Sequence, residues 1–349
     1  MNSLKIGDRI IQESGKPFII AEAGVNYENS METALEMVRQ AAKNGADAIK
    51  FQSYKAETIA AKDSPAYWDT DKTQRDFFKL YDSFGEDEYK ELAREAEKQK
   101  IFFLSTPFDN SAIDFLEPIV PLYKIASADI TNIPFLRYIA KTKKPIFLST
   151  GAATLGEIQN AIKTIKAVEN VPIVPLHCIL SYPTDFKDAN LRMIKHLRKV
   201  FPEHLVGYSD HTKPDRAMIT LIVAYLMGAV VLEKHFTLDK TLPGNDHYHA
   251  MDPQDLKLLT ENVDLVTKIL GEKEKKIIEA ELPARKNARR SIVTTRALKK
   301  GDVITSENVT TKRPGKGIEP TYYDLLLGKK ILKDLEEDEI LYWEYFFES

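Results

Sequence analysis

Short runs of apolar residues recur along the chain, and polar residues scarcely interrupt them. Eight of these runs are rich in Ile, Val, Leu and Phe. Continuous apolar runs of this length are typical of strands that are buried on both faces, as in a parallel sheet. We predict strands at residues 18–22, 48–52, 101–106, 122–127, 146–150, 173–178, 205–210 and 229–235.

Amphipathic stretches with helical spacing lie between these runs, for example at residues 31–46 and 155–168. A strand followed by a helix, repeated eight times, is the plan of an α/β fold of the (β/α)8 TIM-barrel type. We assign residues 1–271 to this barrel. Residues 53–85 separate the second strand from its helix, and we interpret this long loop as a lid or substrate loop.

The pattern changes after the eighth predicted helix, at residues 253–270. The charged residues 272–284 that follow are typical of a linker. Residues 285–349 contain short β-like pieces separated by turn signals, so we predict a small β-rich domain there.

The charge balance narrows the class of partner. The 349 residues include 49 Lys and Arg and 52 Asp and Glu, for a formal net charge of −3. This balance gives no support for nucleic-acid or membrane binding and favours small-molecule partners. A single cysteine, Cys178, excludes a disulfide framework, the first residues lack the regions of a secretion signal, and no apolar stretch approaches the ~18 residues of a membrane span. We expect a cytoplasmic protein.

The predicted strands end in polar residues. A TIM barrel places its active site at this end of its strands. A single buried Lys or His usually has a structural role, such as a hydrogen bond within the core. Here that structural role would have to be repeated at the ends of all eight strands, which lie at the same rim. We therefore predict a catalytic or binding rim from Glu22, Lys50, Gln52, Ser105, Thr106, Lys124, Ser127, Asp129, Ser149, Thr150, His177, Ser209, Asp210, His211, Glu233, Lys234 and His235.

Two of these residues are lysines embedded in apolar strands, with serines on neighbouring strands. Ammonium groups bind phosphate as point charges, and hydroxyls add donors. A cradle for a small phosphorylated or carboxylated anion is therefore predicted from Lys50, Lys124, Ser127, Ser149 and Ser209. A desolvated lysine could instead be the Schiff-base nucleophile of an aldolase, and the sequence leaves both chemistries open.

Four histidines lie at the ends of the last two predicted strands or in the loop after the eighth. His211 and His235 end neighbouring strands, so we predict that they bind one divalent ion and leave coordination positions open for water and substrate. His247 and His249 form an H-x-H pair, whose side chains face one way in an extended chain. Because their loop offers no third ligand, we interpret this pair as loop-shaping residues.

The chain resembles the sialic acid synthase family, which includes N-acetylneuraminate, legionaminate and pseudaminate synthases. The resemblance covers nearly the whole chain and rests on eight motifs in order: IIAEAGVNYENS (19–30), GADAIKFQ (45–52), FLSTPFD (103–109), YKIASADITNIPFL (123–136), FLSTGAATLGEI (147–158), LHC followed by YPT, VGYSDHT (206–212) and EKHFTLDKTLPGNDH (233–247). Residues 289–318 resemble the antifreeze-like SAF domain that follows the barrel in these enzymes.

The resemblance implies a transferase that condenses phosphoenolpyruvate with an open-chain 2-acetamido sugar, giving a nine-carbon 2-keto sugar acid and phosphate. It implies a divalent metal, manganese first, with magnesium or cobalt as alternatives. Asp129 would steer the attacking water and move protons. By the same resemblance, phosphoenolpyruvate is held by the five cradle residues, the metal by His211 and His235, and the sugar by Glu22, Gln52, Tyr182, Asp246 and Arg313.

Arg313 matches a family arginine that reaches into the partner subunit's barrel, so the resemblance implies a domain-swapped homodimer. The chain departs from the family at two positions. Many members have Glu in place of Asp129, and relatives often have Asn or Ser in place of Leu180, whose contact to phosphoenolpyruvate would then be missing or made by Ser181.

Two questions stay open at this level. The acceptor could be N-acetylmannosamine or a trideoxy diacetamido hexose, and two imidazoles with oxygen ligands do not select one metal. A different class of function is a sugar- or ice-binding protein that uses only the C-terminal domain. The fully populated rim argues against that hypothesis.

Overall fold

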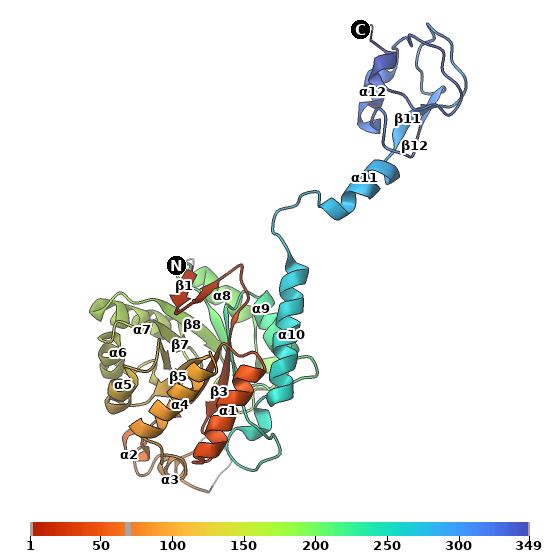
Figure 1. Cartoon of the computed structure of the whole chain (residues 1–349). Helices are drawn as coiled ribbons and strands as arrows, with labels where there is room; N and C mark the ends of the chain where they lie inside the picture. Colours follow the sequence, from red (N-terminus) through yellow and green to blue (C-terminus); the bar gives the residue numbers. More distant parts are fainter. Residues whose placement is uncertain (1–2, 67–70, 348–349) are drawn as a thin grey trace. The chain divides into compact units, whose positions relative to one another are not determined.

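The computed structural model describes residues 3–66 and 71–347 (Figure 1). The chain divides into two compact units, residues 1–271 and 272–349. Each unit has its own apolar core.

The first unit is the predicted parallel barrel. Within its described residues, eight parallel strands form one sheet in the order β5-β4-β3-β10-β9-β8-β7-β6, and the end strands β5 and β6 lie side by side. All eight predicted strands are confirmed. They are β3 (Phe18–Gly24), β4 (Ala48–Ser53), β5 (Phe102–Pro107), β6 (Tyr123–Ile125), β7 (Ile146–Ser149), β8 (Ile173–Cys178), β9 (Gly207–Asp210) and β10 (Val231–His235).

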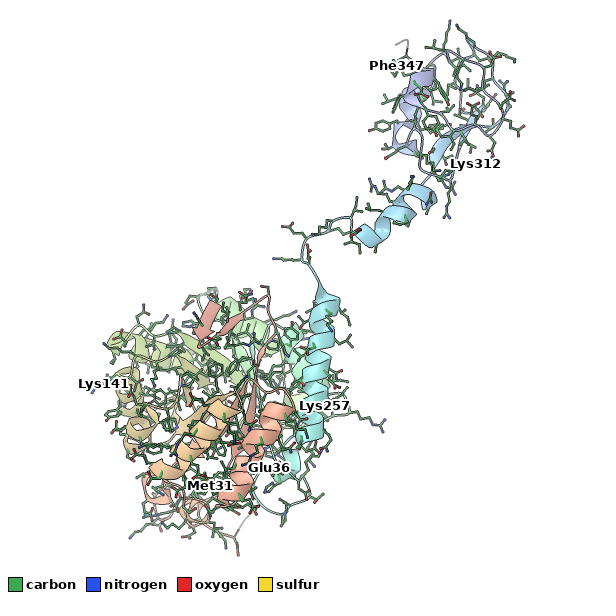
Figure 2. The ribbon with its side chains drawn as sticks, in the orientation of Figure 1. Met31, Glu36, Lys141, Lys257, Lys312 and Phe347 are labelled. Atoms are coloured by element: carbon green, nitrogen blue, oxygen red, sulfur yellow. The ribbon has the colours of Figure 1, made fainter. Side chains whose placement is uncertain are left out.

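A helix follows each strand and covers the outside of the barrel (Figure 1). Side-chain caps fix where several begin: Ser30 accepts from the backbone N–H of Thr33 in α1, and Thr154 and Glu157 form a capping box in α7. Figure 2 shows Lys257 of α10 directed away from the barrel. The helices are α1 (Met31–Lys43), α4 (Glu86–Lys98), α5 (Asn110–Leu116), α6 (Ile133–Ala140), α7 (Leu155–Val168), α8 (Arg192–Val200), α9 (Ile219–Leu226) and α10 (Pro253–Leu270).

None of the helices within residues 3–66 and 71–347 combines the length and the apolar character that crossing a membrane would need.

The long loop after β4 contains two short helices, α2 (Ala56–Ile59) and α3 (Gln74–Lys79). The Lys55 ammonium donates to the carbonyl oxygens of Asp82 and Phe84, at 2.6 and 2.9 Å, and thereby ties the two ends of the loop together. The predicted lid includes residues 67–70, which lie outside the described residues.

A hairpin that the apolar pattern did not predict precedes the barrel. Its strands, β1 (Ser3–Ile6) and β2 (Arg9–Gln12), are antiparallel. Leu4, Ile6 and Ile11 are buried against Phe18 and Val231, at the amino-terminal ends of the barrel strands. The hairpin therefore covers the end of the barrel opposite the predicted rim.

The second unit is small and rich in irregular structure. It contains α11 (Leu282–Ala288), the antiparallel pair β11 (Ser291–Thr294) and β12 (Val309–Lys312), and α12 (Tyr323–Leu326). Its core includes Ile292, Ile331 and Leu341, all fully buried.

Candidate active site

The alternation of side chains along each strand decides which residues point into the barrel. In β3, Phe18 and Ile20 belong to the apolar cluster that fills the interior, so Glu22 points inside above them. The interior is therefore apolar at the amino ends of the strands and polar at their carboxyl ends. The polar interior residues are Glu22, Lys50, Gln52, Thr106, Lys124, Ser149, Ser209, Glu233 and His235.

Polar residues on the other face of the strands do not join this set. The Lys234 ammonium donates to Asp210 Oδ2 at 2.7 Å, and both residues are buried. His177 Nε2 lies 2.9 Å from the carbonyl oxygen of Ala189. The rim predicted from every polar strand end is thus wider than the site, because a side chain one position away along a strand lies on the opposite face.

Two ammonium groups and two carboxylates alternate inside the barrel. Lys124 Nζ lies 3.0 Å from Glu233 Oε1, and the hydroxyl of Ser209 donates to the same oxygen at 2.9 Å. Lys50 pairs with Glu22 and lies 3.9 Å from Glu233 Oε1. The predicted cradle lysines thus come together, and Glu233, which the sequence placed in the rim without a specific role, lies between them.

The two buried carboxyls have different proton affinities. Burial raises the pKa of Glu22, and the neighbouring Lys50 offsets only part of that effect. Burial also acts to raise the pKa of Glu233, but the charges of Lys124 and Lys50 outweigh it and lower the pKa well below the usual range. Glu233 is therefore a permanent counter-ion, whereas Glu22 can take up a proton near neutral pH.

One serine of the cradle packs closely against a glycine. The N–H of Gly151 donates to Ser127 Oγ at 2.9 Å, and a Cβ on residue 151 would lie only 2.8 Å from that oxygen and 3.3 Å from Cys178 Sγ. The hydroxyl of Ser149 is buried and has no hydrogen-bond partner among the described residues. This unused hydroxyl is suited to a bound anion.

Asp129 ends a short 3-10 turn, Ser127–Asp129, that follows β6. Its Oδ1 accepts a hydrogen bond of 3.2 Å from Asn132 Nδ2. Burial raises the pKa of Asp129, and the bond from Asn132 partly opposes this. A carboxylate with a raised pKa on the rim is suited to accept a proton.

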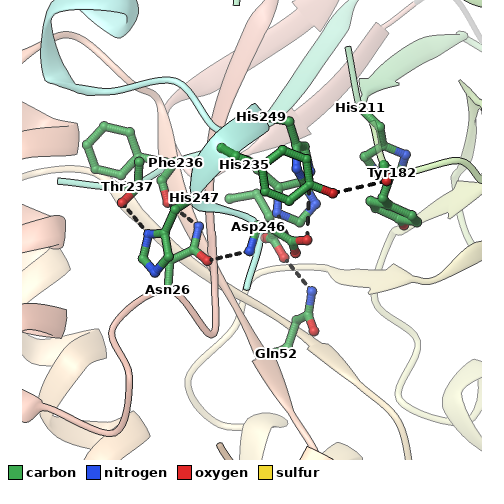
Figure 3. Close-up of polar contacts among 12 residues, drawn as sticks. Asn26, Gln52, Tyr182, His211, His235, Phe236, Thr237, Asp246, His247 and His249 are labelled. Carbon is green, nitrogen blue, oxygen red and sulfur yellow. Dashed lines mark hydrogen bonds and ion pairs between the residues drawn. The ribbon is translucent and has the colours of Figure 1, made fainter. Parts of the chain in front are cut away.

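His211 and His235 lie close together, as their strands predict. The ring centroids are 5.4 Å apart, and Tyr182 packs on His211 at 4.2 Å (Figure 3). His211 Nδ1 lies 2.7 Å from the carbonyl oxygen of Ile179, which leaves Nε2 for a ligand. His235 Nδ1 lies 3.2 Å from Asp246 Oδ2. Burial lowers the pKa of His235 well below its usual range, and a neutral imidazole is the form that binds a metal.

His247 and His249 point in different directions, unlike an extended H-x-H pair. They lie in a 3-10 turn, in which residues two apart do not share a face. His247 Nδ1 lies 2.7 Å from Thr237 Oγ1 (Figure 3). Its Nε2 lies 3.4 Å from Glu28 Oε1. These contacts fix the loop. The structure does not support the loop-shaping interpretation of His249, which lies beside His235 with a ring separation of 5.0 Å.

A divalent ion fits these residues. One ligand atom from each of His235, Asp246 and His249 lies within 4.8 Å of the others. His235 Nδ1 has the 3.2 Å contact with Asp246, and both ring nitrogens of His249 are buried without a hydrogen-bond partner among the described residues. Neutral imidazoles together with a carboxylate form a donor set typical of Mn, Fe, Co and Zn.

Comparison with known proteins identifies the families to which the two parts of the chain belong. The model of the NeuB family matches residues 37–275. The chain belongs to the NeuB family. A SAF domain matches residues 289–346. The resemblance inferred from the eight motifs, and the order of barrel and SAF domain, are thereby confirmed.

Relatives of this NeuB-family chain match it over nearly its full length. An uncharacterized protein of Methanocaldococcus jannaschii is 44% identical and covers 99% of this chain and 98% of its own. The N,N'-diacetyllegionaminic acid synthase of Campylobacter jejuni is 39% identical, over 93% of this chain and 99% of that enzyme. The crystal structure of the N-acetylneuraminic acid synthetase of Leptospira borgpetersenii, in complex with citrate, has a TM-score of 0.73 and 34% identity, and covers 80% of this chain and 94% of that one.

The remaining residues that the resemblance to the family assigned differ from one another in burial and in hydrogen bonding. Gln52 Nε2 donates to Glu22 Oε1 at 3.1 Å, which places both at the predicted sugar end. Ser181, the suggested substitute for Leu180, is exposed, and its hydroxyl lies 3.3 Å from the carbonyl oxygen of Pro183. Arg313 is exposed in the second unit.

Proposed function

We propose that this protein condenses phosphoenolpyruvate with an open-chain 2-acetamido sugar to give a nine-carbon 2-keto sugar acid and phosphate. The main support is the barrel interior. Lys50 pairs with Glu22, which is the register partner of His235 on β10, and Lys124 pairs with Glu233, two residues before His235. His235 in turn forms the candidate metal cluster with Asp246 and His249. The two lysines suit a bound anion, and a metal ion at the cluster would suit the oxygen of an aldehyde. The NeuB-family relatives are named as synthases of sugar acids, which agrees with this chemistry.

Phosphoenolpyruvate would lie in the predicted cradle. Lys124 and Ser209 now donate to Glu233, and Lys50 donates to Thr106 at 2.9 Å. A phosphate or carboxylate could share these donors, because each ammonium carries three N–H groups. Ser127 and Ser149 add hydroxyls from neighbouring strands.

The sugar would lie against Glu22, Gln52, Tyr182 and Asp246. A divalent ion held by His211 and His235 would supply a Lewis acid for the aldehyde oxygen, with manganese as the first expectation and magnesium or cobalt as alternatives. The chain's own task is to orient the aldehyde toward carbon 3 of phosphoenolpyruvate. Glu22, whose pKa burial raises, can give its proton to the alkoxide oxygen that forms from the aldehyde and so produce the new hydroxyl.

Asp129 would complete the reaction at carbon 2. Attack by carbon 3 on the aldehyde leaves positive charge at carbon 2, and a water molecule adds there. Asp129 takes a proton from that water, and the tetrahedral product then expels phosphate and forms the keto group. The hydrogen bond from Asn132 holds the Asp129 carboxylate in position.

The Schiff-base alternative is less compatible with the contacts of both lysines. Lys124 pairs with Glu233, and Lys50 lies 3.9 Å from the same carboxylate. An ammonium held by a buried carboxylate is a poor nucleophile, because a Schiff base forms from the neutral amine. Borohydride should therefore trap no keto acid on either lysine.

We also propose a cytoplasmic, domain-swapped homodimer in which Arg313 of one subunit contacts the sugar in the other. An exposed arginine in the second unit is compatible with this role. The mass of the protein in solution tests the dimer.

Phosphate release tests the proposed reaction. We expect release only when phosphoenolpyruvate, a divalent metal and an acetamido sugar are all present, because each supplies a group that the chain does not contain. Three acceptors should be compared: N-acetylmannosamine and the trideoxy diacetamido hexoses that correspond to legionaminic and pseudaminic acid. We expect the legionaminic precursor to be preferred, given the relative from Campylobacter jejuni.

The control for this assay is His235→Ala in the presence of a chelator, which we expect to be inactive. Full activity of that variant would contradict the metal-dependent mechanism. Release of phosphate at the same rate without any sugar would contradict the condensation.

A further inference from the structure

We propose that His249 is a direct third imidazole ligand of the divalent ion, together with His211 and His235. The proposal deepens the proposed function and rests on it for the presence of the ion. It assigns a metal-binding role to a residue of the loop after β10, which the sequence pattern alone did not connect to the site.

The backbone holds His249 against the end of β10. The N–H of Met251 donates to the carbonyl oxygen of His235 at 2.8 Å, and the N–H of Thr237 donates to that of Met251 at 3.0 Å. These bonds align the loop with the strand. The Tyr248 hydroxyl donates to the carbonyl oxygen of Tyr182 at 3.0 Å and fixes the loop from its other side. His249 is therefore positioned before any ligand binds.

The His249 imidazole has unused hydrogen-bonding capacity. The residue is 0% exposed, and neither ring nitrogen has a hydrogen-bond partner among residues 3–66 and 71–347. Leaving a buried polar group without a hydrogen bond destabilises the folded protein. His247, in the same turn and equally buried, contacts Thr237 and Glu28 instead. The difference indicates that the partner of His249 is something that binds in the site.

The ring of His249 lies close to both predicted metal-binding histidines. The centroids are 5.4 Å apart for His211 and His235, 5.0 Å for His235 and His249, and 6.4 Å for His211 and His249. His249 and His235 each place a ring nitrogen within 4.8 Å of the other and of an Asp246 oxygen. No ring nitrogen of His211 joins that group among the described residues, so its ring would turn toward the ion on binding.

Asp246 adds a carboxylate to the same cluster. Its Oδ2 lies 3.2 Å from His235 Nδ1, and its Oδ1 lies 3.8 Å from His249 Nε2. Three imidazoles beside one carboxylate favour Mn, Fe, Co or Zn over Mg, because Mg prefers oxygen ligands. We expect the protein to bind Co²⁺ at concentrations at which Mg²⁺ does not compete.

Cobalt binding tests the assignment without any turnover. The affinity of the full-length protein for Co²⁺ should be measured by titration for the wild type, His249→Ala and the matched control His247→Ala. We expect His249→Ala to lose at least about 10–100-fold in affinity, because loss of a group that only supports a ligand already costs that much. His247→Ala should stay within about twofold of the wild type, since His247 faces away from the cluster. Unchanged affinity of His249→Ala would overturn the proposal.

A cysteine in place of His249 provides a second measurement. Thiolate is a strong ligand of this class of metal, so Co²⁺-loaded His249→Cys should show a thiolate-to-cobalt charge-transfer absorption that the wild type lacks. His247→Cys controls for the native Cys178, which lies 3.8 Å from His211 Nδ1. Absence of the band from His249→Cys that still binds Co²⁺ would show that His249 contacts the sugar or a water molecule, and would overturn direct ligation.

Both measurements omit phosphoenolpyruvate and sugar, so the two proposals can fail separately. Phosphate release by the wild type together with His249-independent Co²⁺ binding would reject the third ligand and retain the synthase. Co²⁺ binding that depends on His249, in a protein that releases no phosphate with any acceptor, would retain the metal centre and reject the synthase.

Discussion

Replacement of Lys124 by Met is expected to lower kcat/KM for phosphoenolpyruvate by about 10²–10³-fold, the effect of removing one preorganised electrostatic group from an active site. The Lys124 ammonium is 3.0 Å from Glu233 Oε1 inside the barrel. Without it, the cradle keeps only one of its two cations, and Glu233 repels the incoming anion. Steady-state phosphate release at varied phosphoenolpyruvate concentration measures the effect.

The same substitution should also weaken the fold. Removing one partner of a buried ion pair leaves the other charge uncompensated, at a cost of about 3–5 kcal/mol in the free energy of unfolding. The double variant Lys124→Met/Glu233→Gln removes both charges and should recover most of that stability in urea unfolding, but not the activity. Recovery of activity in the double variant would contradict the role of Lys124 in anion binding. Lys257→Met, at an exposed pair with Glu261, should change neither quantity.

Replacement of Asp129 by Asn is expected to lower kcat by about 10²–10⁴-fold, the usual contribution of a general base, with little change in the KM for phosphoenolpyruvate. Asn keeps the shape of the side chain but cannot accept the proton from water. Asp129→Glu should restore most of the activity, because Glu carries the same proton-accepting carboxylate on a side chain that is one methylene longer.

The pH profile distinguishes a proton acceptor from a merely structural residue. Burial raises the pKa of Asp129, and the base must be ionised to act. Activity should therefore fall, as pH is lowered, at a higher pH than an ordinary aspartate would give. This fall in activity at low pH should be missing from the pH profile of the residual activity of Asp129→Asn. An Asp129→Asn enzyme with wild-type kcat would contradict the assignment.

The barrel and its interior could be predicted because both depend on the two-residue period of a strand. The runs that carry Lys50 and Lys124 are apolar on both sides of the lysine, which identifies a buried strand and an unusual buried cation together. The period also places Glu233 inside the barrel, two residues from His235. That position was visible in the sequence, but the contact of Glu233 with both lysines depends on barrel closure.

The surroundings of His249 could not be predicted, because they depend on the turn type. An extended chain would place His247 and His249 on one side, whereas the 3-10 turn separates them. The bonds between Met251, His235 and Thr237 that bring the turn onto β10 join backbone groups, which carry no residue-specific signal. The β1-β2 hairpin was missed for a related reason, since its two strands of four residues are too short to give a clear period.

In the proposed reaction, carbon 3 of phosphoenolpyruvate becomes bonded to the aldehyde carbon of an acetamido sugar. The ¹³C NMR spectrum of the product formed from phosphoenolpyruvate labelled at carbon 3 and sugar labelled at its aldehyde carbon reports this bond. We expect a one-bond coupling between the two labels, in a product that forms in equal amount to the released phosphate. Phosphate release with no coupling between the labels would rule out the condensation.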